Sequence, residues 1–167
     1  MQLVVMGVSG CGKSTIGKLI AIKYGAEFID GDDLHPQGNI EKMSQGIPLE
    51  DSDRWPWLES IARELNTIGH GVIACSALKR SYRSAILSVA PKTLFIHLHG
   101  SREVLESRLA NRQSHFMPAK LLDSQLLTLE ELDSDEPGFV VDIDKSEDEI
   151  VNEISAWIDE HNAKLST

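Results

Sequence analysis

The chain has 167 residues, and its 26 acidic side chains against 16 Lys and Arg give a formal net charge of −10. This length allows one domain with a sizeable core, and 41% hydrophobic with 25% charged residues excludes a disordered, collagenous or repeat-built protein. Residues 130–160 hold 13 acids against one base, Lys145, a local net charge of −12 that leaves +2 for the remainder. The acidic total disfavours nucleic acid as a partner, yet most of the chain can still bind anions.

Two cysteines, Cys11 and Cys75, are too few for a disulfide framework, and neither has metal-ligand spacing such as C-x-x-C. The first apolar run begins at Leu3 with no charged leader before it. No stretch approaches the ~18–20 apolar residues that a membrane span needs. We therefore expect a cytoplasmic protein without a membrane partner.

Apolar runs of strand length recur at residues 3–6, 26–29, 72–75, 93–98 and 139–143. Segments with helical spacing separate these runs, which predicts an α/β fold with a five-stranded parallel sheet flanked by helices.

The last helical segment is the clearest. Its apolar residues Ile150, Val151, Ile154, Trp157 and Ile158 fall on one helical face. Ser146 and Glu149 form a capping-box pattern at its start. No linker or repeat divides the chain, so we predict a single domain over residues 1–167.

Residues 7–14 match the pattern G-x-x-x-x-G-K-[S/T] and lie between the first apolar run and a helical segment, 15–24. Such a loop directs backbone N–H groups at phosphate oxygens, while Lys13 spans the terminal phosphates and the Ser14 hydroxyl ligates Mg²⁺. We therefore predict an ATP site and a P-loop nucleoside triphosphate hydrolase fold. The predicted nucleotide contacts are Gly7, Val8, Ser9, Gly10, Cys11, Gly12, Lys13, Ser14 and Thr15.

Cys11 occupies a variable position of this loop, near a helix N-terminus, where a thiolate is favoured. The residue type favours a small filler over a reactive thiol. Inactivation by a thiol reagent, with protection by ATP, would identify the reactive case.

A P-loop serves motors, switches and kinases, so the use of the nucleotide must be inferred from other residues. The guanine-reading motif N-K-x-D is absent, and the D-x-x-G string at 135–138 is misplaced for a switch. Residues 30–36 read Asp-Gly-Asp-Asp-Leu-His-Pro and follow the second strand, so their carboxylates would face the crevice that holds the transferred phosphoryl group. A simple turn after the strand explains the same residues when they are taken alone. With the P-loop present, we predict a small phosphotransferase in which Asp32 is base and metal partner.

Further segments carry a resemblance to a known family. They are residues 30–36, 39–43, 46–49, 51–54, 56–58, 75–79, 82–83 and 114–116. In this collinear order, from Met6 to about Asp144, the chain resembles the bacterial-type gluconokinase family. The resemblance implies phosphorylation of D-gluconate on its 6-hydroxyl by ATP and Mg²⁺. It also implies a nucleoside-monophosphate-kinase-like fold, a lid over about 108–130, and a homodimer.

A polyhydroxy anion needs a base, cations and hydrogen-bonding groups. Asp32 is the predicted base or orienting carboxylate for the 6-hydroxyl. The predicted cationic contacts are Arg54, Lys79 and Arg83, and the predicted polar contacts are His35, His115 and, more weakly, Gln125. Each of these could equally be a satisfied surface residue on physical grounds alone. The family resemblance favours the site role.

Arg108 and Arg112 are four residues apart on one predicted helix, beside a polar excursion at 111–120. We predict that both guanidinium groups reach phosphate oxygens when a mobile lid closes, rather than pairing with Glu103 or Glu106. Many relatives have a glycine beside His115, whereas this chain has Gln113 and Ser114 before it. We expect this difference to change the flexibility of the lid, and so the rate of the reaction more than the type of reaction.

Asp51 and Asp53 are predicted to cap a helix over 55–68, with Trp55 and Trp57 as packing residues. His97 and His99 suggest no role beyond their alternation along a strand. Residues 142–146 resemble the loop that lies against adenine in related kinases.

Two alternatives remain open. One is a kinase for another hydroxy acid or a nucleotide, although the Gly-Gly-Gly segment of shikimate kinases and the Asp-Gly-Phe-Pro-Arg segment of adenylate kinases are absent. The other is a regulatory nucleotide-binding module without turnover, which the intact Lys13, Ser14 and Asp32 disfavour.

Overall fold

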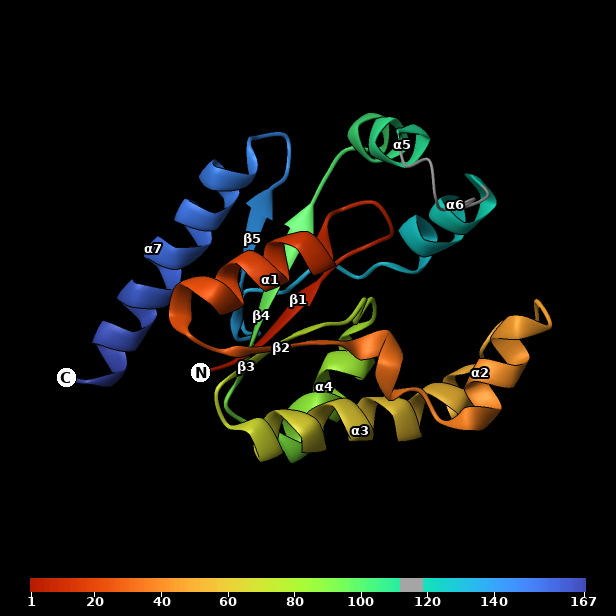
Figure 1. Ribbon diagram of the computed structural model, residues 1–167, viewed down its shortest axis with the longest axis horizontal. Coiled ribbons are helices and arrows are strands. Elements are labelled where there is room, and N and C mark those ends of the chain that lie inside the picture. Colours follow the sequence, from red (N-terminus) through yellow and green to blue (C-terminus); the bar gives the residue numbers. More distant parts are fainter. Residues whose placement is uncertain (112–118) are drawn as a thin grey trace.

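A parallel β-sheet forms the centre of the protein in this computed structural model, which describes residues 1–111 and 119–167 (Figure 1). The strands are β1 (Gln2–Met6), β2 (Glu27–Asp30), β3 (Gly71–Ala74), β4 (Thr93–His99) and β5 (Gly138–Asp142). The strand order is β2-β3-β1-β4-β5, and every neighbouring pair is parallel. Each predicted strand is confirmed to within a residue or so at either end.

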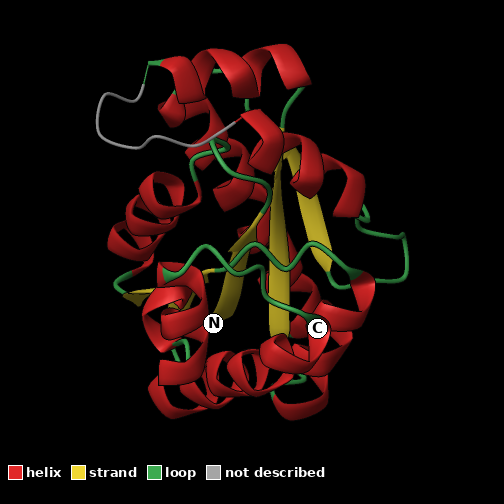
Figure 2. Ribbon diagram, turned by 90° about the vertical axis from the view of Figure 1, so that its right-hand side faces the viewer, coloured by secondary structure: helices red, strands yellow, loops and turns green. Residues whose placement is uncertain are grey.

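Helices connect the strands and lie on both faces of the sheet (Figure 2). They are α1 (Lys13–Tyr24), α2 (Gln37–Ser44), α3 (Asp51–Ile68), α4 (Arg80–Val89), α5 (Arg102–Ala110), α6 (Ala119–Thr128) and α7 (Glu147–Leu165), with a 3₁₀ turn, η1, at Gly31–Leu34. The predicted start of α7 is confirmed, because Ser146 Oγ accepts from Glu149 N–H at 3.2 Å and the Glu149 carboxylate accepts from Ser146 N–H at 2.9 Å.

Burial on both faces explains why strand β1 is apolar throughout. Leu3 and Val5 point into the cluster beneath α1 and α7, whereas Val4 and Met6 point into the cluster beneath α3 and α4. All four side chains are fully buried. In a strand that is covered on both faces, every apolar side chain contributes to stability by being buried. A continuous apolar run is therefore typical of a parallel sheet in an α/β protein.

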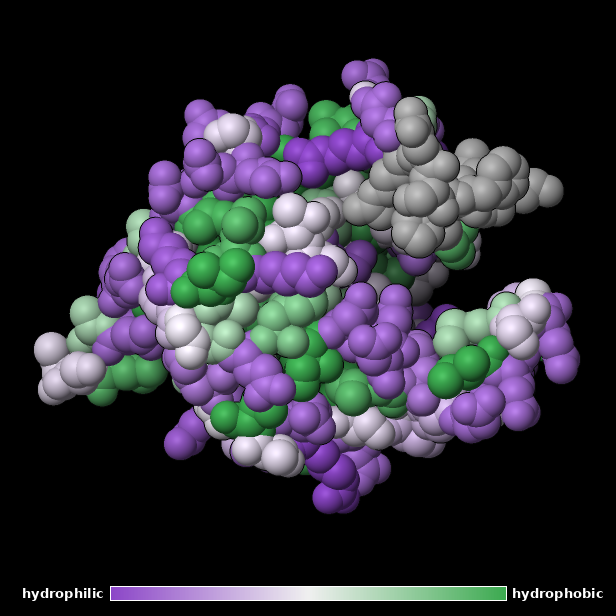
Figure 3. Space-filling model, viewed as in Figure 1, coloured by the Kyte–Doolittle hydropathy of each residue, from purple (hydrophilic) through white to green (hydrophobic). Residues whose placement is uncertain are grey.

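The site is positioned by strand order. Strand β1 has β3 on one side and β4 on the other, so the chain crosses from one half of the sheet to the other beside β1. At such a switch point the carboxyl ends of the strands leave a crevice that binds ligands. The P-loop that follows β1 lies at this crevice, and the space-filling view shows the surface hollowed above the projecting α2 (Figure 3).

No helix among the described residues is both long enough and apolar enough to cross a membrane.

Candidate active site

The loop between β1 and α1 has the backbone of a phosphate cradle. Gly7, Gly10 and Gly12 have φ angles of 143°, 86° and 93°, which L side chains rarely adopt. A Cβ built on Gly7 would lie 2.7 Å from the Sγ of Cys11. The Cys11 side chain is fully buried beneath the loop. This burial supports the packing role of Cys11 over the reactive thiol.

Lys13 lies folded over the same loop. Its Nζ donates to the carbonyl oxygens of Gly7 at 3.0 Å and Val8 at 3.1 Å. The ammonium group is therefore held beside the loop amides and the N-terminus of α1, where these groups together favour an anion.

A cavity of about 370 Å³ opens beside the cradle. Four segments far apart in the sequence line it: the P-loop with the start of α1, the region around Asp32, the end of β3, and α6. The lining residues are Ser9, Gly10, Lys13, Ser14, Asp30, Asp32, Ala74, Cys75, Ser76 and Gln125. The fold therefore brings Lys13, Ser14 and Asp32, the predicted phosphate, metal and base residues, into one cavity together with Ser9 and Gly10 of the loop.

Asp32 reaches this cavity from the 3₁₀ turn that follows β2. A Cβ on Gly31 would lie 2.5 Å from the Ala74 carbonyl oxygen, so the turn can approach β3 only with glycine there. The Asp30 carboxylate accepts from the Asp32 N–H at 3.0 Å and holds the turn. Surrounding protein atoms partly desolvate the Asp32 carboxylate and raise its pKa, and Asp30 adds to this rise while His35 and Lys13 oppose it. Asp32 is therefore a stronger base than an ordinary aspartate.

His35 is fixed beside Asp32 by helix α3. Its ring stacks on Trp57 with centroids 4.2 Å apart, and its Nδ1 lies 3.2 Å from the Asn39 amide nitrogen. Trp57 also donates its Nε1–H to the Gly31 carbonyl at 2.8 Å, so one buried side chain braces both ends of the turn. Burial lowers the pKa of His35, which Arg54 lowers further and Asp32 opposes. The neutral imidazole is thus favoured. Trp57 is the packing residue that the sequence predicts, and its bracing contact with Gly31 is an additional role.

The predicted cations Arg54 and Lys79 are brought together by a single carboxylate. Arg54 Nη1 and Lys79 Nζ each lie 3.4 Å from an Asp51 oxygen. The prediction that Asp51 caps the helix is wrong, because α3 begins at Asp51 itself and its carboxylate is turned toward these cations. Asp53 does take part in capping, since its Oδ2 accepts from the Glu50 N–H at 2.9 Å.

Trp55 is only partly a packing residue. Its side chain is 41% exposed and meets the Tyr82 ring edge-on with centroids 5.7 Å apart.

Arg83 is not brought to the cavity. Its side chain is fully buried, and Nε and Nη2 donate to the Glu136 carboxylate at 2.7 and 3.0 Å. Nη1 donates to the carbonyls of Ala77 and Leu78 at 2.9 and 3.3 Å. The predicted contact with substrate is replaced by a structural one, because a saturated and buried guanidinium has no donor left for a solute.

Gln125 contacts the cradle. Its Oε1 accepts from the Ser9 N–H at 2.7 Å, so α6 is joined to the P-loop at the edge of the cavity. Gln125, a predicted substrate contact, is thus hydrogen-bonded to the backbone N–H of Ser9 in the P-loop.

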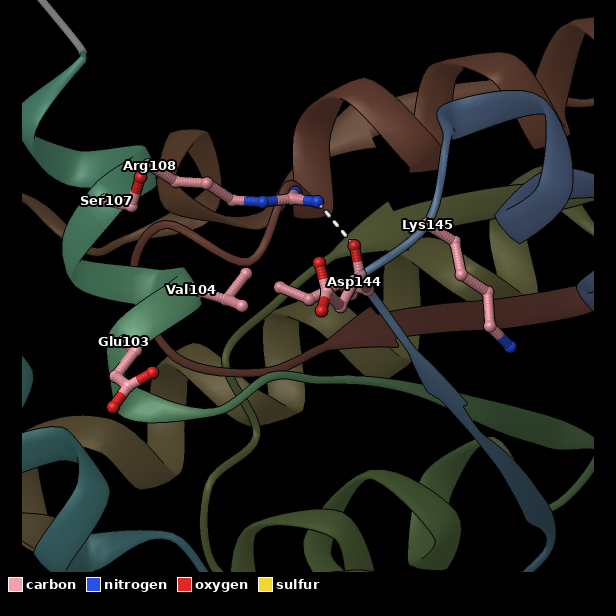
Figure 4. Close-up of a pocket in the computed structure, with 7 residues that line it drawn as sticks. Glu103, Val104, Ser107, Arg108, Asp144 and Lys145 are labelled. Carbon is pink, nitrogen blue, oxygen red and sulfur yellow. Dashed lines mark hydrogen bonds between the residues drawn. The ribbon is translucent and has the colours of Figure 1, made fainter.

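Arg108 points from α5 toward the loop after β5 (Figure 4). Its guanidinium donates to the Ile143 carbonyl at 2.5 Å, and Nη1 would lie 3.6 Å from a Cβ on Gly12. A cavity of about 460 Å³ borders it, lined by Glu103, Val104, Ser107, Arg108, Ile143, Asp144 and Lys145. Arg108 therefore lies between the phosphate cradle and the segment predicted to contact adenine.

Arg108 also borders a second hollow, of about 320 Å³, which is lined in part by Gly12 and Thr15. Arg112 and His115, the other predicted lid residues, lie outside the described part of the chain.

His97 shows a feature that sequence reasoning missed. It is buried at the carboxyl end of β4, and its Nδ1 has no hydrogen-bond partner among the described residues. Burial, with smaller contributions from His99 and Arg83, lowers the pKa of His97 to about 4. Strand alternation in the sequence carries no sign of this environment.

A glycine-rich cradle after β1, a lysine over it and a carboxylate beyond the next strand define a P-loop phosphotransferase for a small molecule. The family model described as shikimate kinase matches residues 9–159. The chain is 47% identical to a probable gluconokinase from Xenopus tropicalis, over 95% of this chain and 94% of the relative. It is 48% identical to a gluconokinase from Gluconobacter oxydans, over 91% and 88% of the two chains.

A crystal structure of a gluconokinase from Sinorhizobium meliloti superposes with a TM-score of 0.91 at 48% identity, covering 99% of this chain and 95% of the other. The chain belongs to the gluconokinases, within the shikimate kinase family.

Proposed function

We propose that the protein transfers the γ-phosphoryl group of ATP to the 6-hydroxyl of D-gluconate, giving ADP and 6-phospho-D-gluconate. The observation that carries this proposal is the single cavity shared by Lys13, Ser14 and Asp32. Phosphoryl transfer depends mainly on positioning and on stabilising charge, and these three residues supply a cation, a hydroxyl and a carboxylate at one place.

Asp32 orients the acceptor hydroxyl and takes its proton. The hydroxyl oxygen forms the new bond to the γ-phosphorus, the bond from phosphorus to the ADP oxygen breaks, and the proton moves to the Asp32 carboxylate. The raised pKa of Asp32 favours this transfer. Lys13 and the loop amides stabilise the charge on the phosphoryl oxygens.

The donor set of the cavity suits Mg²⁺. Ser14 and Asp32 provide hard oxygen ligands beside the cradle, and Mg²⁺ characteristically binds one or two protein oxygens together with substrate phosphates. Among the described residues, no cluster of three His, Cys, Asp or Glu side chains forms an all-protein metal cage. When bound, Mg²⁺ would neutralise phosphate charge in the transition state.

The nucleotide is assigned to the side of the cradle that carries Arg108. The backbone of the β5–α7 loop at Asp144 and Lys145 offers acceptors and donors for the base, and Arg108, which donates to the Ile143 carbonyl of this loop, offers a planar cation for the phosphates of the nucleotide. The acid end of gluconate is assigned to Arg54 and Lys79, with His35 as a hydroxyl partner. The roles of Arg112 and His115, the homodimer and the cytoplasmic location stay predictions.

The test is ADP release with Mg·ATP across D-gluconate, shikimate, nucleoside monophosphates and other sugar acids. We expect turnover with D-gluconate alone and 6-phosphogluconate as the product identified by phosphorus NMR. Lys13→Ala is the control that ties the measured turnover to this cavity: its kcat should fall at least ~10²-fold while the protein remains folded. Turnover with a different acceptor would replace gluconate in the proposal. Tight ATP binding without any turnover would favour the regulatory module.

A further inference from the structure

Asp51 and Tyr82 form a small platform beneath the two cations that are assigned to the acid end of the substrate. The Tyr82 hydroxyl donates to Asp51 Oδ1 at 2.5 Å, which is the shortest contact of the group. By contrast, the Asp51 oxygens lie 3.4 Å from Arg54 and from Lys79. The carboxylate is thus anchored by the phenol and only loosely engaged by the cations.

The aromatic ring of Tyr82 holds the same two cations from another direction. The Arg54 guanidinium carbon lies 5.6 Å from the ring centroid, and Lys79 Nζ lies 5.5 Å from it. Both distances are within the range of cation–π attraction. Two positive groups that would repel each other are therefore held side by side by one ring and one carboxylate.

These cations retain donors for a ligand. The side chains of Arg54 and Lys79 are 31% and 36% exposed, and Asp51 is 43% exposed. Two cations and one carboxylate leave a net charge of +1, which matches one carboxylate of an incoming acid.

The cluster is connected to the cavity through Asn39 and His35. The Asn39 side-chain amide donates to the carbonyl of Asp53, the residue before Arg54, at 2.9 Å, and it lies 3.2 Å from His35 Nδ1. His35 in turn lies near enough to the cavity residue Asp32 for their charges to interact. This arrangement suits a molecule with a carboxylate at one end and a hydroxyl at the other.

We infer that Asp51 and Tyr82 are positioning residues that hold Arg54 and Lys79 as a receptor for a single carboxylate and so select monoanionic acids over neutral polyols. This inference rests on the proposed function for the identity of the acid. Neither residue touches the substrate, and both act by setting the spacing and direction of the two cations.

The test compares D-gluconate with its neutral amide, D-gluconamide, in Tyr82→Phe and Asp51→Asn. Tyr82→Phe keeps the ring and removes only the anchoring hydroxyl, and Asp51→Asn keeps an acceptor and removes the charge. For each variant we expect KM for gluconate to rise about five- to tenfold, with kcat within about twofold of the wild type. The KM of gluconamide, which keeps the 6-hydroxyl and serves as an alternative substrate, should change by less than about twofold, because the neutral amide makes little use of the cations.

The matched control is Glu59→Gln, which removes an exposed ion pair with Arg63 elsewhere on α3. This variant should leave the KM values for gluconate and gluconamide at their wild-type values. A general loosening of α3 against α4 would weaken gluconate and gluconamide equally and would overturn the inference, as would tighter gluconate binding by Asp51→Asn or an unchanged KM in Tyr82→Phe.

Wild-type turnover separates the two proposals. If the wild type does not phosphorylate gluconate, the proposed function fails, and the acid that the panel identifies is compared with its own amide in the same variants. If gluconate is phosphorylated and the variants keep the wild-type preference for acid over amide, only the positioning role fails.

Discussion

Two charged clusters meet helix α4 and differ in whether their charges are satisfied. In the first, Arg83 is fully buried and the side chain of its partner Glu136 is 5% exposed, and every guanidinium nitrogen of Arg83 has a protein acceptor. In the second, Arg54 and Lys79 are about one-third exposed and share the single carboxylate of Asp51 at 3.4 Å. Both arginines were predicted as substrate contacts, yet only Arg54 has donors to spare.

The difference separates structural charge from functional charge. A buried guanidinium must be fully paired, since an unpaired charge in the interior is costly. A ligand site has the opposite requirement, because its cations must remain unsaturated until the ligand arrives. Counting the free donors of each cation therefore distinguishes the two roles better than the residue type does.

The largest expected effect is a loss of turnover at the ligand site. Asp32→Asn should lower kcat by ~10²–10³-fold because the amide cannot accept the proton, while the melting temperature stays at the wild-type value. Coupled ADP release and thermal unfolding measure the two quantities. Asp33→Asn, at the next position, which does not line the cavity, is the matched control and should retain wild-type turnover. Near-normal kcat in Asp32→Asn would remove the base role.

Next in size is a loss of stability when the buried pair of Arg83 and Glu136 is broken. Arg83→Met leaves Glu136 buried without its partner and should cost about 3–5 kcal/mol of unfolding free energy. For a chain of this size that corresponds to a fall of roughly 6–20 °C in Tm. KM for gluconate, measured at low temperature on the folded protein, should stay near the wild-type value.

A second substitution checks the cause. Adding Glu136→Met to Arg83→Met removes the orphaned carboxylate and should recover most of the lost stability. A large rise in KM for Arg83→Met at an unchanged Tm would instead restore Arg83 as a substrate contact.

The pH profile should show a smaller effect within the cavity. Asp32 acts in its ionised form and its pKa is raised, so kcat/KM should fall on acidification at a higher pH than an ordinary aspartate would give. Asp30→Asn removes a neighbouring negative charge, while its amide oxygen can still accept from the Asp32 N–H. The acid limb should therefore move to lower pH. A limb that stays in place would show that Asp32 does not control it.

The smallest effect is expected at an exposed pair near Arg83. Arg80 donates to Asp133 and Asp135 at 2.6 Å, but its side chain is 44% exposed. Because solvent and salt screen such pairs, Arg80→Gln should shift Tm no more than Arg63→Gln does on α3. A loss comparable to that of Arg83→Met would mean that pairing, rather than burial, explains the stability of this cluster.

Much of the architecture is readable from local sequence. The five strands, the cradle glycines and the capping box of α7 are each specified by neighbouring residues, through apolar runs, backbone freedom and short-range hydrogen bonds. The placement of Asp32 in the site also follows, because the carboxyl ends of parallel strands share one edge.

The roles of the charged residues depended on distant contacts. Arg83 and Glu136 are 53 positions apart, and Asp51 and Tyr82 are 31 apart, so no local pattern pairs them. The same holds for Arg108, whose partner Ile143 lies 35 residues further along the chain.

By itself, therefore, the sequence determined the order of strands and helices, the nucleotide cradle and the family. Only the tertiary structure decided which cations are saturated and which remain free, because burial and partner choice arise when segments far apart in the chain are packed together.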